Sequence, residues 1–374
     1  MIAARLHDYG KPMTLDRIPV PEPRPTDVLV EVKACGVVPN MTRVVSNFFG
    51  NLSTERKLMP PLPAIFGLDP TGVVTKVGSE VRSIALGQRV YVNPARRCGS
   101  CRMCRSGQPL DCPDFTFQGY FGRSQDIMKA YPYGGFCQFI TAPEDALVRL
   151  PDSVKFEDAA RLGYLGTAYA AMKKLGVGPG VTFLVNGISG QLGLCAAMLA
   201  LAMGATKILG TGRNMTLLQR VKALSPRRIE VFAFDDTKTG DQAAFMAWTR
   251  SLTDGYGVDR MLDCLPPGAP AAAMMRALYS LGRGGRAANV GAVMEVLPLN
   301  AFWLMTNRIS LQGSVWFTTG EGEEMAAMLA AGTLDLSALE HRIAPLSDIN
   351  QVIAGMDERD GGFTNFIIDP TRVN

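Results

Sequence analysis

Two different spacings of hydrophobic residues divide the chain into two parts. Up to about residue 150, short apolar stretches such as residues 28–32 (VLVEV) and 72–77 (GVVTKV) are interrupted by Pro or Gly every few positions. Short strands separated by turn residues at this spacing are typical of an antiparallel, barrel-like domain. The first part is therefore predicted to consist mostly of β-strands.

From about Glu157 onward, short apolar runs alternate with segments of helical composition. Such alternation predicts a doubly wound parallel sheet, so the fold class is α/β. The last segment, from Glu321, is expected to carry a helix and to end in a strand that returns to the first part. The strands predicted for the sheet are 182–185, 207–211, 229–234, 258–262, 286–290 and 310–317, and the helices are 167–175, 192–203, 215–224, 241–252 and 269–281.

The strand at residues 182–185 ends in a glycine-spaced turn, with Gly187, Gly190 and Gly193 at every third position. A strand, a tight turn and a helix N-terminus bring unpaired backbone N–H groups together, which suits a phosphate. The spacing is looser than the usual G-x-G-x-x-G fingerprint, so a tight turn without a ligand is the alternative. The residues expected to bind a dinucleotide in this loop are Gly187, Ser189, Gly190, Gln191 and Leu192.

The next strand, residues 207–211, ends about twenty residues after the glycines, where the ribose of an adenosine half would lie. Gly212, Arg213 and Asn214 follow it. NAD enzymes usually carry Asp or Glu at this point to bind the ribose 2′-OH, whereas an Arg binds a 2′-phosphate. The predicted cofactor is therefore NADP(H), and the alternative is that Arg213 is a solvated loop residue.

Four of the eight cysteines lie in one short segment with the spacing C-x2-C-x2-C-x7-C. Four thiolates this close in sequence can surround Zn²⁺ in a tetrahedron at about 2.3 Å per bond. An iron–sulfur cluster or incidental thiols are the alternatives. Because four thiolates leave no open position, about one structural zinc per chain is expected. The predicted ligands are Cys98, Cys101, Cys104 and Cys112.

Length and charge narrow the class of protein further. A chain of 374 residues is long for one core, which favours two domains. The net charge is only +4 and the basic residues are scattered, so no nucleic-acid partner is expected. No apolar run reaches the roughly 18 residues of a membrane span, and the N-terminus has no apolar signal core. A cytoplasmic protein with a small-molecule substrate is the expectation.

Taken together, these motifs resemble those of the medium-chain dehydrogenase/reductase superfamily, which includes zinc-type alcohol dehydrogenases and quinone oxidoreductases. The segments KACGV (33–37), IFGLDPTGV (65–73), the cysteine loop, GYLGTAY (163–169) and the glycine loop stand in the order of that family. The resemblance implies a GroES-like β-barrel domain at residues 1–155 and 319–374 and a Rossmann domain at residues 156–318. It also implies a cleft between them with Thr167 and Gly291 near the nicotinamide, and a homodimer or homotetramer paired through residues 310–317.

The alcohol dehydrogenases of this family hold a second, catalytic zinc, and the chain departs from them there. The positions that correspond to its ligands are Val38, Leu68 and Gly163, none of which binds zinc. Only the acid beside the second position survives, as Asp69, and a set that uses Cys35 and Asp69 is the alternative. Zinc stabilises the alkoxide in alcohol oxidation. Hydride addition to an electron-poor carbon can proceed with hydrogen-bond donors that hold the developing enolate.

Three functions are therefore weighed. The first is an NADP(H)-dependent reductase of an enone, an enal or a quinone. The second is a zinc-independent alcohol dehydrogenase or ketone reductase, and the third is a non-catalytic NADPH-binding protein.

The candidate catalytic residues stand at or near the lost zinc ligands. Tyr164 or Asp69 is expected to donate a proton, and Asn40 or Asn93 to hold a carbonyl oxygen. Packing is the alternative role for the tyrosine, and capping for the aspartate. An apolar substrate wall is expected, with a core role as the alternative, from Phe48, Phe49, Tyr120, Phe121 and Trp316.

Overall fold

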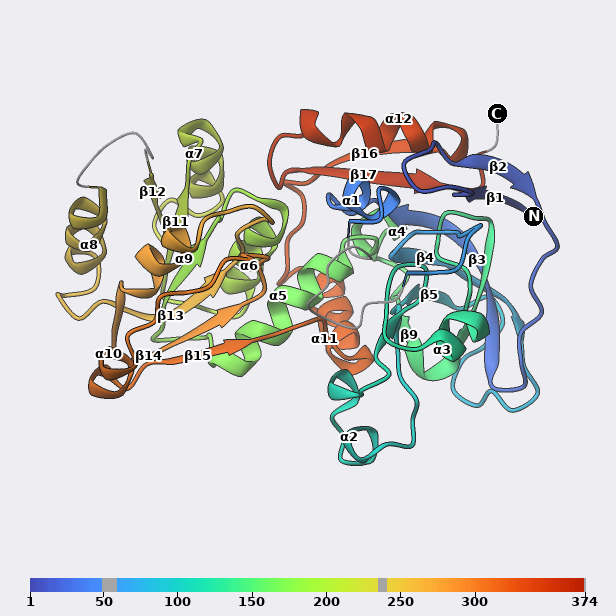
Figure 1. Cartoon of the computed structure of the whole chain (residues 1–374), viewed down its shortest axis with the longest axis horizontal. Helices are drawn as coiled ribbons and strands as arrows, with labels where there is room; N and C mark the ends of the chain where they lie inside the picture. The colour runs from blue at the N-terminus through green and yellow to red at the C-terminus, as the bar shows by residue number, and fades with distance from the viewer. Residues whose placement is uncertain (49–58, 235–240, 373–374) are drawn as a thin grey trace.

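The computed structural model describes residues 1–48, 59–234 and 241–372, and Phe49 lies outside these ranges. Figure 1 shows two lobes side by side, with the N- and C-termini in the same lobe. The helix α5 (Leu162–Leu175) lies between the lobes, and its apolar side chains are mostly buried. Among the described residues, no helix is long and apolar enough to cross a membrane.

The first lobe is built around a mainly antiparallel sheet in the order β16-β17-β3-β4-β5-β9, with β8 beside β3. The strand β3 (Asp27–Gly36) is central because its buried Val, Ala and Cys side chains are covered on both sides. The last strand of the chain, β17 (Thr364–Asp369), pairs antiparallel with β3. The other strands of this sheet are β4 (Asp69–Val77), β5 (Arg89–Val92), β8 (Phe139–Pro143), β9 (Leu147–Arg149) and β16 (Glu340–Pro345).

Short elements surround this sheet. Two small antiparallel pairs are formed by β1 with β2 and by β6 with β7. The strands are β1 (Ile2–Arg5), β2 (Thr14–Arg17), β6 (Ala95–Arg96) and β7 (Thr116–Phe117). The helices are α1 (Met41–Val45), α2 (Arg102–Arg105), α3 (Gln125–Ala130), α4 (Phe156–Ala159), α11 (Thr319–Ala330) and α12 (Ile349–Ala354). The 3-10 turns are η1 (Pro109–Asp111), η2 (Glu144–Ala146), η3 (Leu346–Asp348) and η4 (Gly355–Glu358).

The second lobe is a parallel sheet in the order β12-β11-β10-β13-β14-β15. The strand order reverses between β10 and β13, so a crevice opens at the carboxyl ends of these two strands. The strands are β10 (Thr182–Asn186), β11 (Lys207–Gly212), β12 (Ile229–Ala233), β13 (Val258–Asp263), β14 (Leu281–Asn289) and β15 (Ser310–Gly313). Its helices are α6 (Gln191–Ala202), α7 (Met215–Ala223), α8 (Asp241–Ser251), α9 (Ala271–Leu278) and α10 (Ala301–Asn307).

Several boundaries differ from the sequence-based predictions: the strand expected at 286–290 begins at Leu281, and the helix expected at 269–281 spans Ala271–Leu278. Two further differences have a visible cause. The helix expected from Thr167 begins at Leu162, because Gly163 and Gly166 serve close packing inside the helix rather than a turn. The strand expected through Phe317 ends at Gly313. Trp316 then adopts a φ of 59°, which turns its ring into the first lobe.

Candidate functional site

The glycine loop between β10 and α6 lies at the crevice of the second lobe. Gly187 adopts a φ of +86° and Gly190 is the N-cap of α6. A Cβ at Gly193 would lie 2.1 Å from the Gly187 carbonyl oxygen, so a glycine is needed for the helix to pack this close to the turn. The first N–H groups of α6, including those of Gln191 and Leu192, have no partner within the helix and are suited to an anion.

The end of β11 carries no carboxylate. Gly212 is the last residue of the strand, and a Cβ there would lie 3.2 Å from the Ser189 hydroxyl. Arg213 follows and is exposed, and the Asn214 side chain accepts a hydrogen bond from Leu217 N–H at the start of α7. A cation and a strand end of minimal size therefore face the place where an adenosine ribose would lie.

A buried polar network lies directly beneath the glycine loop, and sequence reasoning missed it. The Thr211 hydroxyl donates to Asn186 Oδ1 at 2.6 Å, and Asn186 Nδ2 donates to Asp263 Oδ1 at 2.7 Å. The Gly187 N–H donates to the Thr211 carbonyl, and Gly291 N–H donates to the Asp263 carbonyl. Burial raises the pKa of Asp263 to about 6. The signal in the sequence was a polar residue at the end of three apolar strands.

On the first-lobe side, Asp69 fills the space beside the start of α5. Its side chain is only 2% exposed, and Tyr91 Oη donates to Asp69 Oδ1 at 2.8 Å. The carboxyl lies against the start of α5, where a Cβ at Gly163 would be 2.1 Å from Asp69 Oδ1 and the Gly163 N–H favours the ionised form. Burial raises the pKa of Asp69 to about 7, although the tyrosine, the nearby Arg161 charge and the N–H oppose this rise.

Tyr164 and Thr167 occupy the next positions of α5. Tyr164 is partly exposed, and burial raises the pKa of its phenol, which keeps the hydroxyl protonated as a donor. The Arg161 guanidinium carbon lies 5.2 Å from the centre of the Tyr164 ring. The Thr167 hydroxyl donates to the Gly163 carbonyl oxygen at 2.8 Å. Asp69, Tyr164 and Thr167 thus gather around the first turns of one helix.

The two asparagines of the predicted site have different surroundings. Asn40 Oδ1 accepts a 2.6 Å hydrogen bond from the Tyr120 hydroxyl, and Asn40 Nδ2 has no partner among the described residues. Asn93 is buried: its Nδ2 donates to the Phe317 carbonyl and its Oδ1 accepts from Trp316 Nε1 at 2.8 Å. The Asn40 amide is therefore open to a substrate oxygen, whereas the Asn93 amide joins the two lobes.

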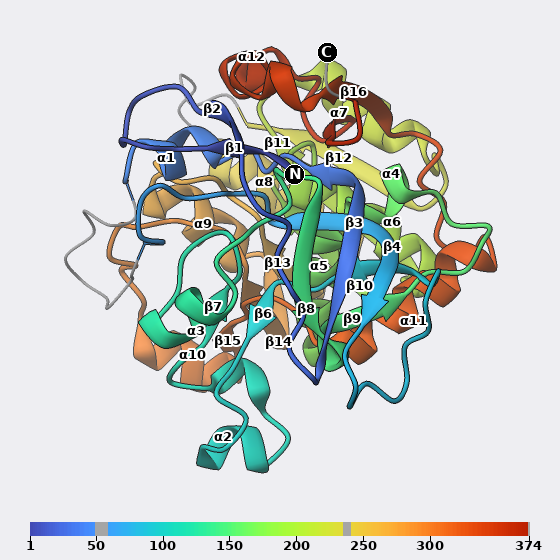
Figure 2. The same cartoon turned by 90° about the vertical axis from the view of Figure 1, so that its right-hand side faces the viewer.

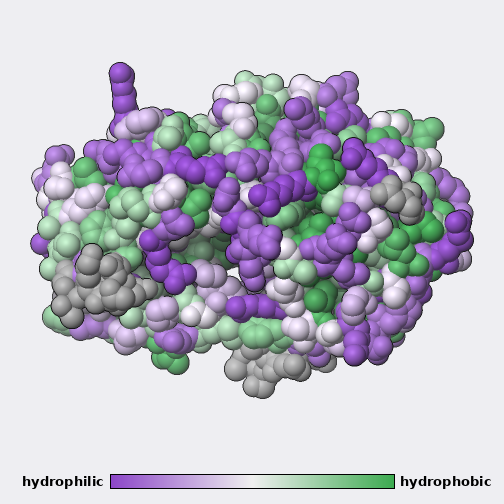
Figure 3. Space-filling model, turned by 90° about the horizontal axis from the view of Figure 1, so that it is seen from above, coloured by the Kyte–Doolittle hydropathy of each residue, from purple (hydrophilic) through white to green (hydrophobic). Residues whose placement is uncertain are grey.

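Of the four described residues of the predicted aromatic wall, two lie in the core and two are partly exposed. Tyr120 and Trp316 are 3% and 6% exposed, and the Trp316 ring packs edge-on against Phe117 at 4.8 Å. Phe48 and Phe121 are partly exposed, and Phe48 lies 5.0 Å from the Arg43 guanidinium. Figure 3 shows the surface hollowed between the two lobes.

Cys98, Cys101, Cys104 and Cys112 form a compact cluster around α2, in a segment that projects from the first lobe (Figures 1 and 2). Their Sγ atoms all lie within 4.8 Å of one another, and two of the separations are 3.6 and 3.8 Å. A tetrahedral zinc with bonds of about 2.3 Å requires sulfur–sulfur edges of about 3.8 Å, so the cluster fits a structural zinc. Backbone N–H groups donate to the sulfurs of Cys98, Cys101 and Cys112, which favours thiolates.

The three positions expected for a catalytic zinc carry no donor side chain. Val38 and Leu68 are 3% and 6% exposed, and Gly163 lies against the Asp69 carboxyl. Within the part of the chain that the structure describes, the cysteine cluster is the only group of three or more His, Cys, Asp or Glu side chains arranged around a common point.

Comparisons with known proteins identify the family of the chain. Residues 24–152 match the model of the alcohol dehydrogenase GroES-like domain, and residues 192–331 match that of the zinc-binding dehydrogenases. Sorbitol dehydrogenase of Bacillus subtilis (strain 168) is 30% identical over 347 residues, which cover 91% of this chain and 88% of that protein. Alcohol dehydrogenase of Geobacillus stearothermophilus is 28% identical over 358 residues, with coverage of 95% and 96%.

Among solved structures, that of AibC superposes with a TM-score of 0.83 at 26% identity, and the alignment covers 99% of this chain and 95% of that one. The chain therefore belongs to the medium-chain dehydrogenase/reductase superfamily, with the zinc-type alcohol dehydrogenases. It is an oxidoreductase with a GroES-like lobe and a Rossmann lobe, and this confirms the fold class predicted from the sequence.

Proposed function

We propose that this protein is an NADP(H)-dependent reductase that transfers hydride to an activated C=C bond of an enone or enal, or to a quinone, without a catalytic zinc. The observation that carries the proposal is the apolar lining at Val38 and Leu68, together with the Asp69 carboxyl in the space beside Gly163. A site of this composition stabilises charge by hydrogen bonds rather than by a Lewis acid. Hydride addition to an electron-poor carbon is the chemistry that such a site supports best.

The bound cofactor would supply the hydride, and the protein would supply orientation and a proton. The loop residues Gly187, Ser189, Gly190, Gln191 and Leu192 would hold its phosphates, and Thr167 and Gly291 would border the nicotinamide. The open Nδ2 of Asn40 is suited to the substrate oxygen, because Tyr120 fixes the orientation of the amide. Tyr164 is the proposed proton donor, since it is neutral and partly exposed, and Asp69 is the ionisable group behind it.

The choice of NADP(H) rests on Gly212, Arg213 and Asn214. An exposed guanidinium after a strand end without a carboxylate can pair with a 2′-phosphate. Replacing Arg213 by Glu is expected to lower the preference for NADPH over NADH, measured as the ratio of kcat/KM values, by at least about tenfold. The matched control is Arg227→Glu, an exposed change just before β12 and thus at the opposite end of the sheet. A parent enzyme that prefers NADH would contradict this part of the proposal.

Oxidation of an alcohol or reduction of a ketone is the second candidate function. It is favoured by the names of the relatives, which include a sorbitol dehydrogenase, an alcohol dehydrogenase and a probable D-xylulose reductase A. A panel of enones, quinones, ketones, aldehydes and polyols, followed by NADPH absorbance, separates the two. Turnover restricted to enones or quinones supports the first function, and turnover of alcohols and ketones alone replaces it with the second. Binding of NADPH without any turnover would indicate a non-catalytic protein.

A further inference from the structure

Arg161 is a buried cation in the joint between the two lobes, immediately before α5. It is 2% exposed and forms no ion pair within the described residues. Its Nη2 donates to the carbonyl oxygens of Gly362 at 3.0 Å and Gln191 at 3.4 Å, and its Nε–H has no partner. Burying a charge without a counter-ion costs free energy, so we looked for a nearby group on which this charge acts.

A chain of hydrogen bonds holds this guanidinium from the first lobe. Arg161 Nη1 lies 3.5 Å from Asn365 Oδ1, and Asn365 Nδ2 lies 3.1 Å from His341 Nδ1. His341 Nε2 in turn lies 2.8 Å from Asp158 Oδ1. Because the Nδ2 group of Asn365 bonds His341 and the Glu157 carbonyl, its Oδ1 is left to face Arg161.

The groups that Arg161 faces belong to the candidate site. Its charge acts on the Asp69 carboxyl, on the Tyr164 phenol, whose ring it contacts, and on the Cys195 thiol of α6. The other groups around Asp69 are Tyr91 of β5, the Gly163 N–H, Cys35 of β3 and the phenol of Tyr120. Arg161 is thus the cation whose charge acts directly on this carboxyl.

The same guanidinium also contacts the cofactor loop. It donates to the carbonyl of Gln191, and the Gly362 N–H beside it donates to the Ser189 carbonyl at 2.8 Å. A Cβ at Gly361 or Gly362 would lie 2.4 or 2.5 Å from the carbonyl oxygens of Ser189 and Gly190. These contacts hold the loop and Arg161 against residues 361–362.

We propose that Arg161 is a positioning residue for the reaction: its buried guanidinium, held by Asn365 and by the backbone of the cofactor loop and in contact with the Tyr164 ring, sets the protonation of Asp69. The inference rests on the proposed function, since it assigns Asp69 to the supply of the proton.

The test compares the parent with Arg161→Gln and Arg161→Lys, which remove and keep the charge. The protonation of Asp69 is followed by infrared difference spectra of the carboxyl band across pH, with Asp69→Asn as the reference, and this readout needs no activity. A nearby opposite charge lowers the pKa of a carboxyl by about one unit or more. The midpoint of the Asp69 titration should therefore move up by about one pH unit in R161Q. R161K should stay near the parent.

The pH profile of kcat/KM for reduction gives the second readout. If protonated Asp69 supplies the proton that Tyr164 donates, activity should fall as pH rises through the Asp69 midpoint near pH 7. In R161Q this fall in kcat/KM should occur at higher pH than in the parent. In the Asp69→Asn background, the Arg161→Gln change should no longer shift the profile. If R161Q fails to fold, Asn365→Leu carries the same test, because it removes the acceptor that anchors Arg161.

The inference would be overturned by an unchanged infrared midpoint of Asp69 in a folded R161Q. It would also be overturned if Arg161→Gln shifted the pH profile of kcat/KM equally in the D69N background. A shifted infrared midpoint without turnover on any substrate would instead retain the Arg161–Asp69 coupling and remove the proposed function.

Discussion

At the residue scale, Asp69 and Gly163 require each other. The carboxyl occupies the space that any side chain at Gly163 would need, and the Gly163 N–H at the start of α5 favours its ionised form. The position that the family resemblance assigns to a zinc ligand is therefore the position that here lies against an acid. Substitution of one residue must displace the other.

Gly163→Ala tests this dependence. Its Cβ would lie 2.1 Å from Asp69 Oδ1, so the variant should lose roughly 1–3 kcal/mol of stability and most of its turnover. Gly320→Ala, in the first turn of α11, is the matched control, because a Cβ there meets nothing within 4 Å. Urea unfolding and kcat are the measurements. If the two variants have the same stability and the same kcat, Asp69 can move away from a side chain at position 163 without cost, and the proposed dependence is wrong.

The buried Asp69 carboxyl also predicts a pH dependence of stability. Its folded-state pKa of about 7 lies above the ordinary value of 3.8, so the folded chain binds this proton more tightly. Stability from this group is therefore lost as pH rises from about 4 to 7, on the order of 4 kcal/mol in total. Asp69→Asn cannot ionise, so its melting temperature relative to the parent should rise between pH 5 and pH 8. A difference that is constant with pH would contradict the assignment.

At the element scale, the cysteine loop is a separate unit held by four sulfurs rather than by a core. The Cys98 side chain is exposed, and α2 is only four residues long, with Cys101 as its N-cap. Short helices of this kind are not stable alone. A structural zinc would supply the missing stabilisation.

Metal analysis of the purified protein is expected to give about one zinc per chain. Removal by a chelator should speed hydrogen exchange in residues 98–112 while the glycine loop at residues 187–193 stays protected, because the sulfur cluster lies away from α6. Cys112→Ser should reproduce the effect, since Cys112 is the buried member of the cluster. About two zinc ions per chain would overturn the mechanism proposed here.

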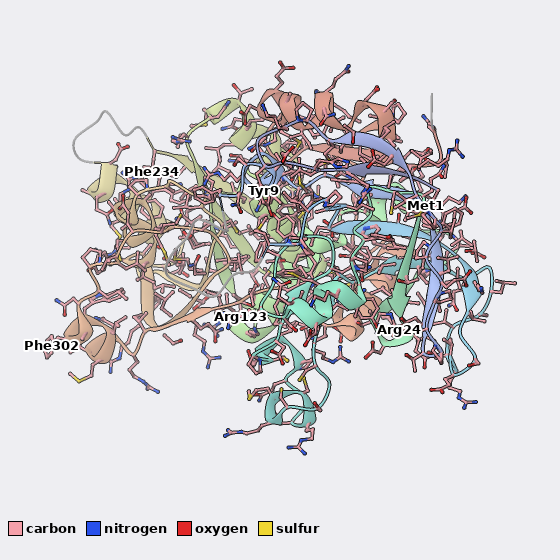
Figure 4. The ribbon with its side chains drawn as sticks, turned by 45° about the vertical axis from the view of Figure 1, so that its right-hand side comes forward. Met1, Tyr9, Arg24, Arg123, Phe234 and Phe302 are labelled. Atoms are coloured by element: carbon pink, nitrogen blue, oxygen red, sulfur yellow. The ribbon has the colours of Figure 1, made fainter. Side chains whose placement is uncertain are left out.

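At the scale of the whole molecule, the free edge of the Rossmann sheet carries exposed apolar side chains. Phe302 of α10 is 70% exposed and projects outward in Figure 4, and Met305 of the same helix is 66% exposed. Val296 and Val315 nearby are 91% and 54% exposed. An apolar edge next to an open strand is typical of an interface between chains. We propose that two copies associate here, in a homodimer or a homotetramer.

Phe302→Asp should therefore shift the particle mass toward the monomer in light scattering, since it places a charge in the centre of the apolar edge. Leu86→Asp, an equally exposed change at 68% in the other lobe, should leave the mass unchanged. A parent protein that is monomeric at micromolar concentration would contradict the proposed interface.

How far the sequence predicts the site depends on the kind of interaction. The cysteine spacing and the glycine spacing are local, so both were found without a structure. Arg161, Asn365 and His341 were not, because they lie far apart in the chain and share no motif. The sequence gives no reason to assign different roles to Asn40 and Asn93. Their hydrogen-bond partners in the fold, Tyr120 for Asn40 and Trp316 for Asn93, distinguish them.

The sequence by itself determined the two-lobed class, the alternation of strand and helix, the sulfur cluster and the absence of donor side chains at Val38, Leu68 and Gly163. The first three follow from periodicity and residue type, which are properties of the chain at short range, and the family resemblance singled out the last three positions. Only the tertiary structure decided that Asp69 fills the space at Gly163 and that Arg161 lies behind it. Burial and the distance between charges set the ionisation of such groups, and both arise only when the lobes pack together.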